Sequence, residues 1–236
     1  MNWLRRRGLA PPPADPAHSA RPTEGTDPGN PPAGEGAPFL EGAAPGVTAL
    51  LEGLGAGGGH SVLDLGRASG AKLDLYAPVA RRMRFVDLLE TGVRAGPGGA
   101  AEAWAQAVAD IPAQPDHPYD AVLAWDILDR LPPAQQPALV AHLAGVVGPK
   151  ARLHLLVAAS EAPLPALFRF APLGSGRLRY EVTDLPRPPH PRLHPAEVER
   201  VLEPFRVTRA FTLKVGFREF VAIRGSARSA GSLPRG

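Results

Sequence analysis

The sequence predicts an α/β domain built on a mostly parallel β-sheet, and three observations lead to this fold class. Short apolar segments typical of buried strands alternate with segments whose apolar residues recur at helical spacing, the pattern of a parallel sheet covered by helices. Over residues 61–70 a strand ends in a glycine-bounded turn and introduces a helix. Near the end of the chain, two apolar segments flank a tight turn at Gly216 and predict an antiparallel hairpin.

Composition separates this domain from the two ends of the chain. Residues 1–38 contain nine prolines and few large apolar side chains, so they cannot bury enough surface to offset their ordering entropy. We expect a disordered Pro/Gly-rich tail there, acting either as a neutral tether or as a docking peptide. A second disordered tail is expected over residues 225–236, which leaves residues 39–224 as the folded domain.

Apolar spacing and Gly or Pro boundaries predict the elements of this domain in order. Helices are predicted over residues 47–54, 71–82, 132–148 and 195–202. Strands are predicted over residues 61–66, 83–87, 119–125, 151–158, 206–213 and 217–223. The Ala-rich segment 101–109 fits either a helix or a strand, and a third strand of the sheet is not evident. Residues 159–194 form a Pro-rich insertion or lid, with a short strand over 177–183.

Charge and composition exclude several classes of function. The formal net charge is +3, yet only three lysines occur and the arginines are scattered, with short clusters at 5–7 and 81–84, so we expect no nucleic-acid partner. The absence of cysteine excludes disulfides, thiolate metal sites and a cysteine nucleophile. His190 and His194 have no acidic cluster nearby, and we expect no metal. No apolar run approaches the ~20 residues of a membrane span, which favours a cytoplasmic protein.

The most informative segment is Val62–Gly70, which reads Val-Leu-Asp-Leu-Gly-Arg-Ala-Ser-Gly. A strand that enters a helix through such a turn presents backbone amides and the helix N-terminus at its carboxyl end, where ligands of open α/β sheets bind. A dinucleotide-binding loop would place glycine at positions 66, 68 and 71, but Ala68 and Ala71 occupy two of them.

In order and spacing, these segments resemble a divergent bacterial branch of the class I S-adenosylmethionine (SAM)-dependent methyltransferases. Residues 62–66 are similar to motif I of that family, and residues 83–87 are similar to its second strand. The fourth strand with its turn, the turn into the fifth strand, and the last strand are similar to residues 119–131, 148–155 and 217–223. The resemblance covers residues 40–224. It implies a Rossmann-like, seven-stranded, mostly parallel sheet with an antiparallel last strand.

The resemblance also implies that SAM is the cofactor and that the loop after the first strand holds its methionine end. Asp64 stands in the position that contacts the ligand's amino group directly or through water. Gly66 and Gly70 match two of the family's three loop glycines. Ala68 replaces the third, and Arg67 stands where a small residue is common.

The remaining cofactor contacts are implied further along the chain. Asp87, followed by Leu88, would bind both ribose hydroxyls, unless Asp87 serves only as a helix N-cap. Asp110 and Ile111 would contact the adenine. Trp125 would cover the adenine or the substrate, with packing in the core as the alternative.

Three polar residues leave structural alternatives open. Asp64 lies in an apolar strand, where a carboxylate needs partners, and it could simply hold the amides of its own loop. Asp126 is the one candidate catalytic residue: it would hold a substrate amine or act as a base, or else cap the following turn. His154 lies inside a predicted strand, where we expect a packed, hydrogen-bonded side chain.

The predicted function is methyl transfer from SAM to a small-molecule acceptor, with the insertion 159–194 shaping the acceptor pocket. The acceptor attacks the sulfonium methyl group in line, and the protein mainly supplies proximity, worth up to ~7–11 kcal/mol. A binding or scaffold protein that no longer catalyses is the alternative, favoured by Arg67, Ala68 and the missing third strand. A nucleotide-dependent oxidoreductase is a third hypothesis, opposed by the absent glycines. The sequence does not define the acceptor or the oligomeric state.

Overall fold

The computed structural model describes residues 38–88, 96–159, 166–174, 176–185 and 193–225, with only the backbone of residues 96–100. The chain divides into two units, Met1–Glu35 and Gly36–Gly236, and every described residue belongs to the second. The two predicted tails lie outside the described residues, except for Pro38 and Gly225.

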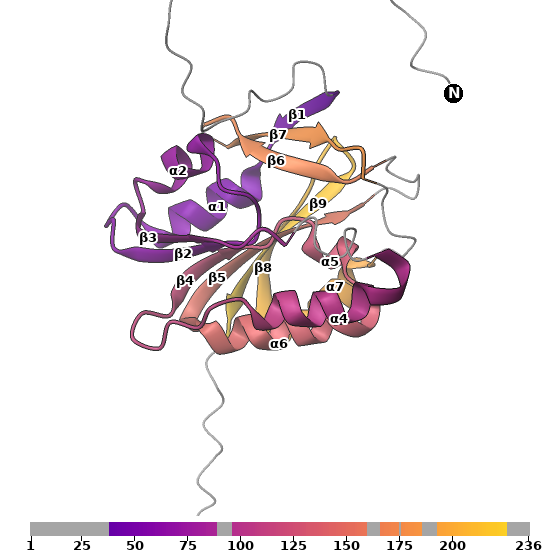
Figure 1. Cartoon of the computed structure of the whole chain (residues 1–236). Helices are drawn as coiled ribbons and strands as arrows, with labels where there is room; N and C mark the ends of the chain where they lie inside the picture. Colours follow the sequence, from indigo (N-terminus) through magenta and orange to yellow (C-terminus); the bar gives the residue numbers. More distant parts are fainter. Residues whose placement is uncertain (1–37, 89–95, 160–165, 175, 186–192, 226–236) are drawn as a thin grey trace, which may run out of the picture. The chain divides into compact units, whose positions relative to one another are not determined.

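The main sheet has six strands in the order β3-β2-β4-β5-β9-β8 (Figure 1). Their bounds are β2 His60–Asp64, β3 Ala80–Phe85, β4 Tyr119–Leu123, β5 Val147–Ala158, β8 Phe205–Thr212 and β9 Phe217–Arg224. All neighbours are parallel except that β9 runs antiparallel to β5 and to β8. The Rossmann-like α/β class, the mostly parallel sheet and the antiparallel last strand are therefore confirmed.

The predicted count of seven strands is wrong for the described residues, which place six in this sheet. Between β3 and β4 the described residues form the helix α4 (Gly96–Ala109) and a connection over residues 110–118, and no strand. The three prolines of this connection disfavour a strand there, because each lacks the N–H group that a sheet ladder requires. As a result β3 is an edge strand.

Helices cover both faces of the sheet (Figure 1). On one face lie α1 (Pro45–Leu54), which contacts β4, β5, β8 and β9, and α2 (Gly70–Tyr76). On the other face α4 packs against α6 (Gln136–Val146). Shorter elements complete the layers: α5 Ile127–Arg130, the 3₁₀ turn Pro133–Gln135 and α7 Pro195–Val201. None of the helices described is long and apolar enough to cross a membrane.

Two helical predictions need comment. The Ala-rich segment that fitted a helix or a strand is helical, as part of α4. The predicted helix 71–82 is too long, because α2 ends at Tyr76 and β3 already begins at Ala80. Pro78 accounts for the early end, since proline cannot continue the helical hydrogen-bond ladder.

A second, three-stranded antiparallel sheet is built from β1 (Phe39–Ala43), β7 (Arg177–Val182) and β6 (Phe168–Pro172), in that order. Strands β6 and β7 belong to the predicted insertion, and of the three strands only β7 is predicted by the sequence. In Figure 1 this sheet lies on the same side of the main sheet as α1 and α2.

Aromatic side chains join the two sheets. Phe170 of β6 stacks on Trp125, which follows β4, with ring centroids 5.4 Å apart. Tyr180 of β7 stacks on Phe217 of β9 at 5.9 Å. The second sheet thus contributes directly to the core above the carboxyl end of the main sheet.

A buried carboxylate lies within this core. Glu219 of β9 accepts a hydrogen bond from the backbone N–H of Gly46 at 2.6 Å, which places its charge at the N-terminus of α1. Its other oxygen pairs with Nε2 of His154 at 2.9 Å. His154 is therefore a packed, hydrogen-bonded residue, as the sequence predicts. A Cβ on Gly46 would lie 2.9 Å from Cδ of Glu219, so only glycine allows this close approach.

The hydroxyl of Tyr180 generates the first prediction. It is buried and has no hydrogen-bond partner among the described residues, and an unsatisfied buried polar group costs about 1–3 kcal/mol. Tyr180→Phe removes that group and keeps the ring, so we expect the free energy of unfolding to rise by about 1 kcal/mol in urea denaturation at pH 7.

Tyr119→Phe is the matched control. The Tyr119 hydroxyl accepts a hydrogen bond from Gln114 at 3.0 Å and donates one to the carbonyl of Pro112 at 3.2 Å. Its removal should lower the free energy of unfolding by about 1 kcal/mol. An equal loss in both variants would contradict the assignment of Tyr180 as unsatisfied.

Candidate functional site

The loop between β2 and α2 lies at the carboxyl edge of the sheet. Gly66 is buried and its N–H donates to Oδ1 of Asp64 at 2.8 Å, whereas Arg67, Ala68 and Gly70 are exposed. Ser69 is the N-cap of α2, since its hydroxyl accepts from the N–H of Lys72 at 3.3 Å. A capped turn of this kind explains why the chain leaves β2 and enters a helix at once.

The carboxylate of Asp64 is buried and accepts four hydrogen bonds. Oδ1 receives the Gly66 N–H, the ammonium of Lys72 at 2.9 Å and the indole N–H of Trp125 at 2.6 Å. Oδ2 receives the hydroxyl of Tyr76 at 2.5 Å. The proposed structural role of Asp64, holding the amides of its own loop, is therefore one part of a larger network.

Two of these donors come from α2 and are themselves buried. Burial raises the pKa of Tyr76 well above its ordinary value of 10.0, and the neighbouring charge of Asp64 adds to the shift. The ammonium of Lys72 also lies 4.6 Å from the centroid of the Trp125 ring, within the range of a cation–π interaction.

Trp125 occupies an unusual backbone conformation at the end of β4. Its φ is 50°, a left-handed value that is rare for a bulky residue, and its side chain is fully buried. The indole N–H bond to Asp64, the stacking on Phe170 and a hydrogen bond from the Leu156 N–H to the Trp125 carbonyl, at 2.7 Å, hold it there. In this structure Trp125 is packed in the core, which is the alternative that the sequence analysis gave to a contact with adenine or substrate.

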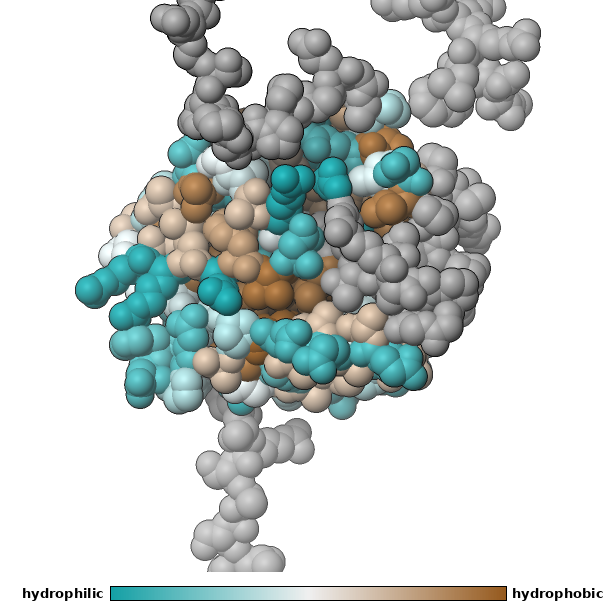
Figure 2. Space-filling view, in the orientation of Figure 1, coloured by the Kyte–Doolittle hydropathy of each residue, from teal (hydrophilic) through white to brown (hydrophobic). Residues whose placement is uncertain are grey.

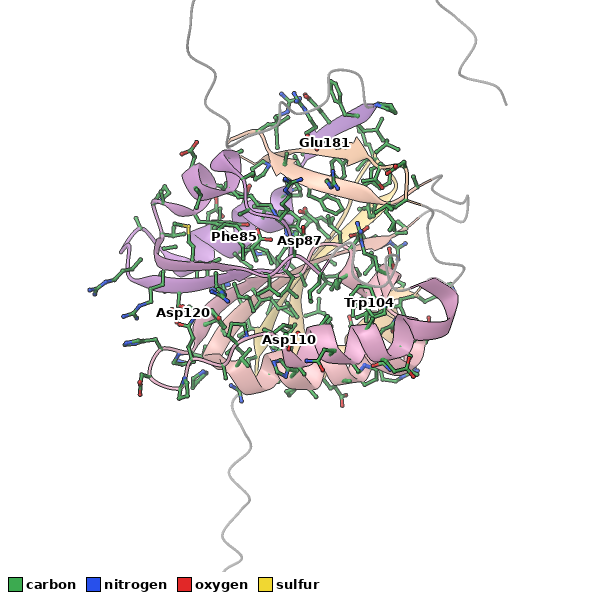
Figure 3. All side chains as sticks on the ribbon, viewed as in Figure 1. Phe85, Asp87, Trp104, Asp110, Asp120 and Glu181 are labelled. Carbon is green, nitrogen blue, oxygen red and sulfur yellow. The ribbon has the colours of Figure 1, made fainter. Side chains whose placement is uncertain are left out.

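A pocket of about 450 Å³ lies next to this network, between the end of β3 and α4. Its lining residues are Val86, Asp87, Leu88, Ala103, Gln106, Ala107 and Asp110. Three predicted cofactor contacts, namely Asp87, Leu88 and Asp110, are thus brought together. Figure 3 shows the two carboxylates on opposite sides of the opening, and Figure 2 shows exposed apolar surface between them.

Backbone hydrogen bonds connect this pocket to the Asp64 network. The N–H of Val86 donates to the carbonyl of Asp64 at 2.9 Å, and the N–H of Leu88 donates to the carbonyl of Leu65 at 3.1 Å. Asp87 therefore follows the end of β3 directly beside the loop that carries Gly66. Asp110 follows the last turn of α4, where its carboxylate accepts from the Gln106 amide at 2.7 Å.

Ile111 and Asp126 do not line the pocket. Ile111 is buried, and its carbonyl is hydrogen-bonded to the His142 ring at 3.0 Å. Asp126 is fully buried and forms an ion pair with Arg130, whose Nε lies 2.7 Å from Oδ1 and whose Nη2 lies 3.1 Å from Oδ2. The helix after Asp126, α5, has no side-chain cap, so the capping bond considered for Asp126 is not formed.

Lys72, Tyr76 and Phe170 complete the site, and the sequence analysis did not identify them. A signal existed for the first two: they are four residues apart on one face of a helix that follows an isolated acid. Phe170 has no such signal, because its contact with Trp125 depends on how β6 pairs. No group of three or more metal-ligating side chains occurs within the described segments.

The residues present fit one half of SAM and not the other. The pocket offers carboxylate acceptors and apolar walls to a nucleoside. At the methionine end, Lys72 fills the space beside Gly66, since a Cβ on Gly66 would lie 2.8 Å from Nζ. As the side chains lie, Asp64 has no room for a further ammonium group.

Comparisons with known proteins give structural similarity alone. No protein-family model matches the chain, and no curated protein matches its sequence significantly. Among solved structures, it is similar to 1,6-didemethyltoxoflavin-N1-methyltransferase of Burkholderia thailandensis, with bound 1,6-didemethyltoxoflavin and S-adenosylhomocysteine. The identity is 20% and the TM-score 0.48, over 77% of each chain.

Two further neighbours are methyltransferases as well. Magnesium protoporphyrin IX methyltransferase of Synechocystis PCC 6803, with bound S-adenosylhomocysteine, has 20% identity and a TM-score of 0.47, over 76% of this chain and 80% of that chain. The N-methyltransferase NodS of Bradyrhizobium japonicum WM9 has 13% identity and a TM-score of 0.46, over 76% and 94%. At these values the similarity assigns no residue role to this chain.

Substitution of the loop glycines tests the packing of this site. In Gly66→Ala the new Cβ would meet Nζ of Lys72 at 2.8 Å, with Oδ1 of Asp64 and Cδ1 of Trp125 at 3.2 Å. Because the ammonium is held on a buried carboxylate, we expect a loss of about 1–3 kcal/mol in the free energy of unfolding, measured by urea denaturation.

Gly70→Ala is the control for that measurement. A Cβ on Gly70 meets nothing within 4 Å, and alanine at the first position of α2 reduces the entropy of the unfolded chain. Its effect should be neutral or stabilising by up to about 1 kcal/mol. Similar losses in both variants would mean that Gly66 is not closely packed.

Alkaline pH should destabilise the protein through Tyr76. The unfolded tyrosine ionises near pH 10, while the folded one keeps its proton because its pKa is raised. The unfolded state then binds fewer protons, and stability falls above pH 10 by up to about 1.4 kcal/mol per pH unit for one tyrosine. Thermal unfolding between pH 8 and 11 should show a shallower decline in Tyr76→Phe, and an unchanged decline would refute the assignment.

Proposed function

We propose that this chain binds SAM through its nucleoside and transfers the methyl group to a small-molecule acceptor. The observation that supports the proposal is the pocket at the carboxyl edge of the sheet, lined by Asp87, which follows β3, and by Asp110, which follows α4. Its volume of about 450 Å³ is in the range of small-ligand sites. The position is also the usual one for ligands of open α/β sheets.

The lining chemistry suits a nucleoside. Ionised carboxylates only accept hydrogen bonds, and a ribose offers two hydroxyl donors while adenine offers an amino group. Asp87, next to β2 and its loop, would take the ribose, and Asp110 the adenine. Leu88 and Ala107 supply the apolar surface against which a planar base packs.

The same lining disfavours phosphorylated ligands. It contains two carboxylates and no basic side chain among the described lining residues. A pyrophosphate placed here would lie next to two acidic side chains, and like charges brought together cost affinity. This distinction supports SAM over a dinucleotide and counts against the oxidoreductase hypothesis.

Methyl transfer depends mainly on how the protein positions SAM and the acceptor relative to each other. SAM supplies an electrophilic methyl group when bound. The side chains of this protein would hold the nucleoside and orient the acceptor, an effect worth up to ~7–11 kcal/mol. No catalytic base is assigned, because Asp126 is committed to its ion pair with Arg130.

A binding protein without turnover is the second candidate, and a specific observation favours it. The carboxylate implied for the methionine end, Asp64, already has four donors from the chain itself. A ligand held only by its nucleoside would be bound without a fixed methyl group.

Calorimetry on the full chain with S-adenosylhomocysteine (SAH) tests the proposed pocket. We expect binding by the wild type, with the affinity reduced at least tenfold in Asp87→Ala and in Asp110→Ala. Each variant loses a charge-assisted hydrogen bond worth about 1.5–3 kcal/mol. Incubation with SAM and a panel of small acceptors, followed by detection of SAH, then separates transfer from binding alone.

Asp116→Ala provides the control, because Asp116 is an exposed acid outside the pocket, and its affinity for SAH should equal that of the wild type. A folded wild type that binds no SAH would refute the proposal. Binding that is unchanged in Asp87→Ala and Asp110→Ala would place the ligand elsewhere.

A further inference from the structure

The ammonium of Lys72 is almost completely removed from water. The exposed fraction of its side chain is 3% and that of Asp64 is 1%, with 2.9 Å between Nζ and Oδ1. Lysine is among the residues least often buried, and the chain has only three lysines. This pair is therefore a specific feature of the site rather than a surface ion pair.

Donors from the chain itself surround both carboxylate oxygens of Asp64. Oδ1 accepts three hydrogen bonds and Oδ2 accepts the Tyr76 hydroxyl, and the side chain is only 1% exposed. A ligand ammonium can reach Asp64 only if one of these donors leaves.

Lys72 is the donor best able to leave. The Gly66 N–H is fixed by the loop backbone, and the Trp125 indole is fixed by stacking on Phe170. The hydroxyl of Tyr76 is carried by a rigid ring that is fully buried. Lys72 instead carries its ammonium on four rotatable carbons, and the residues beside it on α2, Ala71 and Leu73, are exposed.

We propose that Lys72 is a specificity-determining residue that occupies the ammonium subsite of the candidate cofactor site. This inference rests on the proposed function, in which the nucleoside binds beside Asp87 and Asp110. The Lys72 ammonium has the same charge and the same donor chemistry as the α-ammonium of an amino acid. In the wild type, the α-ammonium of a ligand can bind Asp64 only by replacing the ammonium of Lys72. The amino-acid end of the ligand therefore adds little affinity.

The expected preference of the wild type follows. SAH and 5′-methylthioadenosine share the nucleoside and the thioether, but only SAH carries the α-ammonium. We expect the wild type to bind the two compounds with dissociation constants within about threefold of each other. In Lys72→Met, the buried Asp64 charge has no cation until a ligand supplies one. The affinity for SAH should then rise at least tenfold, while the affinity for methylthioadenosine stays within about threefold of the wild-type value.

The experiment is calorimetry on the full chain with both compounds, for the wild type, Lys72→Met and Lys214→Met. Lys214 is exposed at the turn of the β8–β9 hairpin, so Lys214→Met should match the wild type for both ligands. Since an unpaired buried carboxylate can prevent folding, Asp64→Asn with Lys72→Met serves as a second variant. It removes both charges, and it should bind methylthioadenosine as the wild type does without the gain for SAH.

The ratio of the two dissociation constants decides the inference. The inference is supported if the preference for SAH over methylthioadenosine increases at least tenfold in Lys72→Met and does not increase in the double variant. Equal changes for both ligands, weaker SAH binding in Lys72→Met, or a wild type that already prefers SAH a hundredfold would each overturn it. If methylthioadenosine binds every variant and the ratio of the two dissociation constants is the same in all of them, the role of Lys72 is refuted and the proposed function is not. If neither ligand binds any folded variant, the proposed function fails with it.

Discussion

The buried carboxylate of Asp64 is the constraint on which the carboxyl edge of the main sheet depends. A buried charge is stable only if hydrogen-bond donors replace the water that it has lost. The donors to Asp64 come from three separate segments: the loop after β2, helix α2, and the turn after β4. Because the loss of any donor leaves the charge under-solvated, these segments are held in place together. The left-handed backbone of Trp125 is tolerated for the same reason, since its indole is one of the donors.

This network divides the carboxyl edge into a closed half and an open half. In the closed half, Lys72 and Phe170 both contact the ring of Trp125, and Phe170 comes from the second sheet. The open half is the pocket between β3 and α4. A ligand that reached Asp64 would have to displace a side chain of the closed half, whereas a ligand confined to the open half would meet only the residues that line the pocket.

The sequence predicted what depends on local pattern and missed what depends on pairing. Apolar runs bounded by Gly and Pro located all six strands of the main sheet. Asp87 was singled out at the end of a predicted strand, and Asp110 as an acid that precedes an apolar residue and a proline. The ion pair of Asp126 with Arg130 follows an i,i+4 spacing that the sequence displays, although the sequence analysis did not predict it. Strands β1 and β6 could not be predicted, since short segments far apart in the chain form a sheet only through each other.

The open half is a consequence of where the main sheet ends. In the described residues β3 pairs only with β2, and it carries Arg81, Arg82 and Arg84 as exposed side chains. Charges along an edge strand oppose pairing with a further strand. The segment 101–109, which in the sequence fitted a helix or a strand, is helical, and the connection that follows it, residues 110–118, carries three prolines that disfavour a strand. Asp110 begins this connection and lies on the wall of the pocket with Asp87. The absence of a further strand beside β3 in the described residues, which in the sequence favoured a protein that had lost its activity, therefore leaves both carboxylates at one pocket and is by itself no argument against ligand binding at this edge.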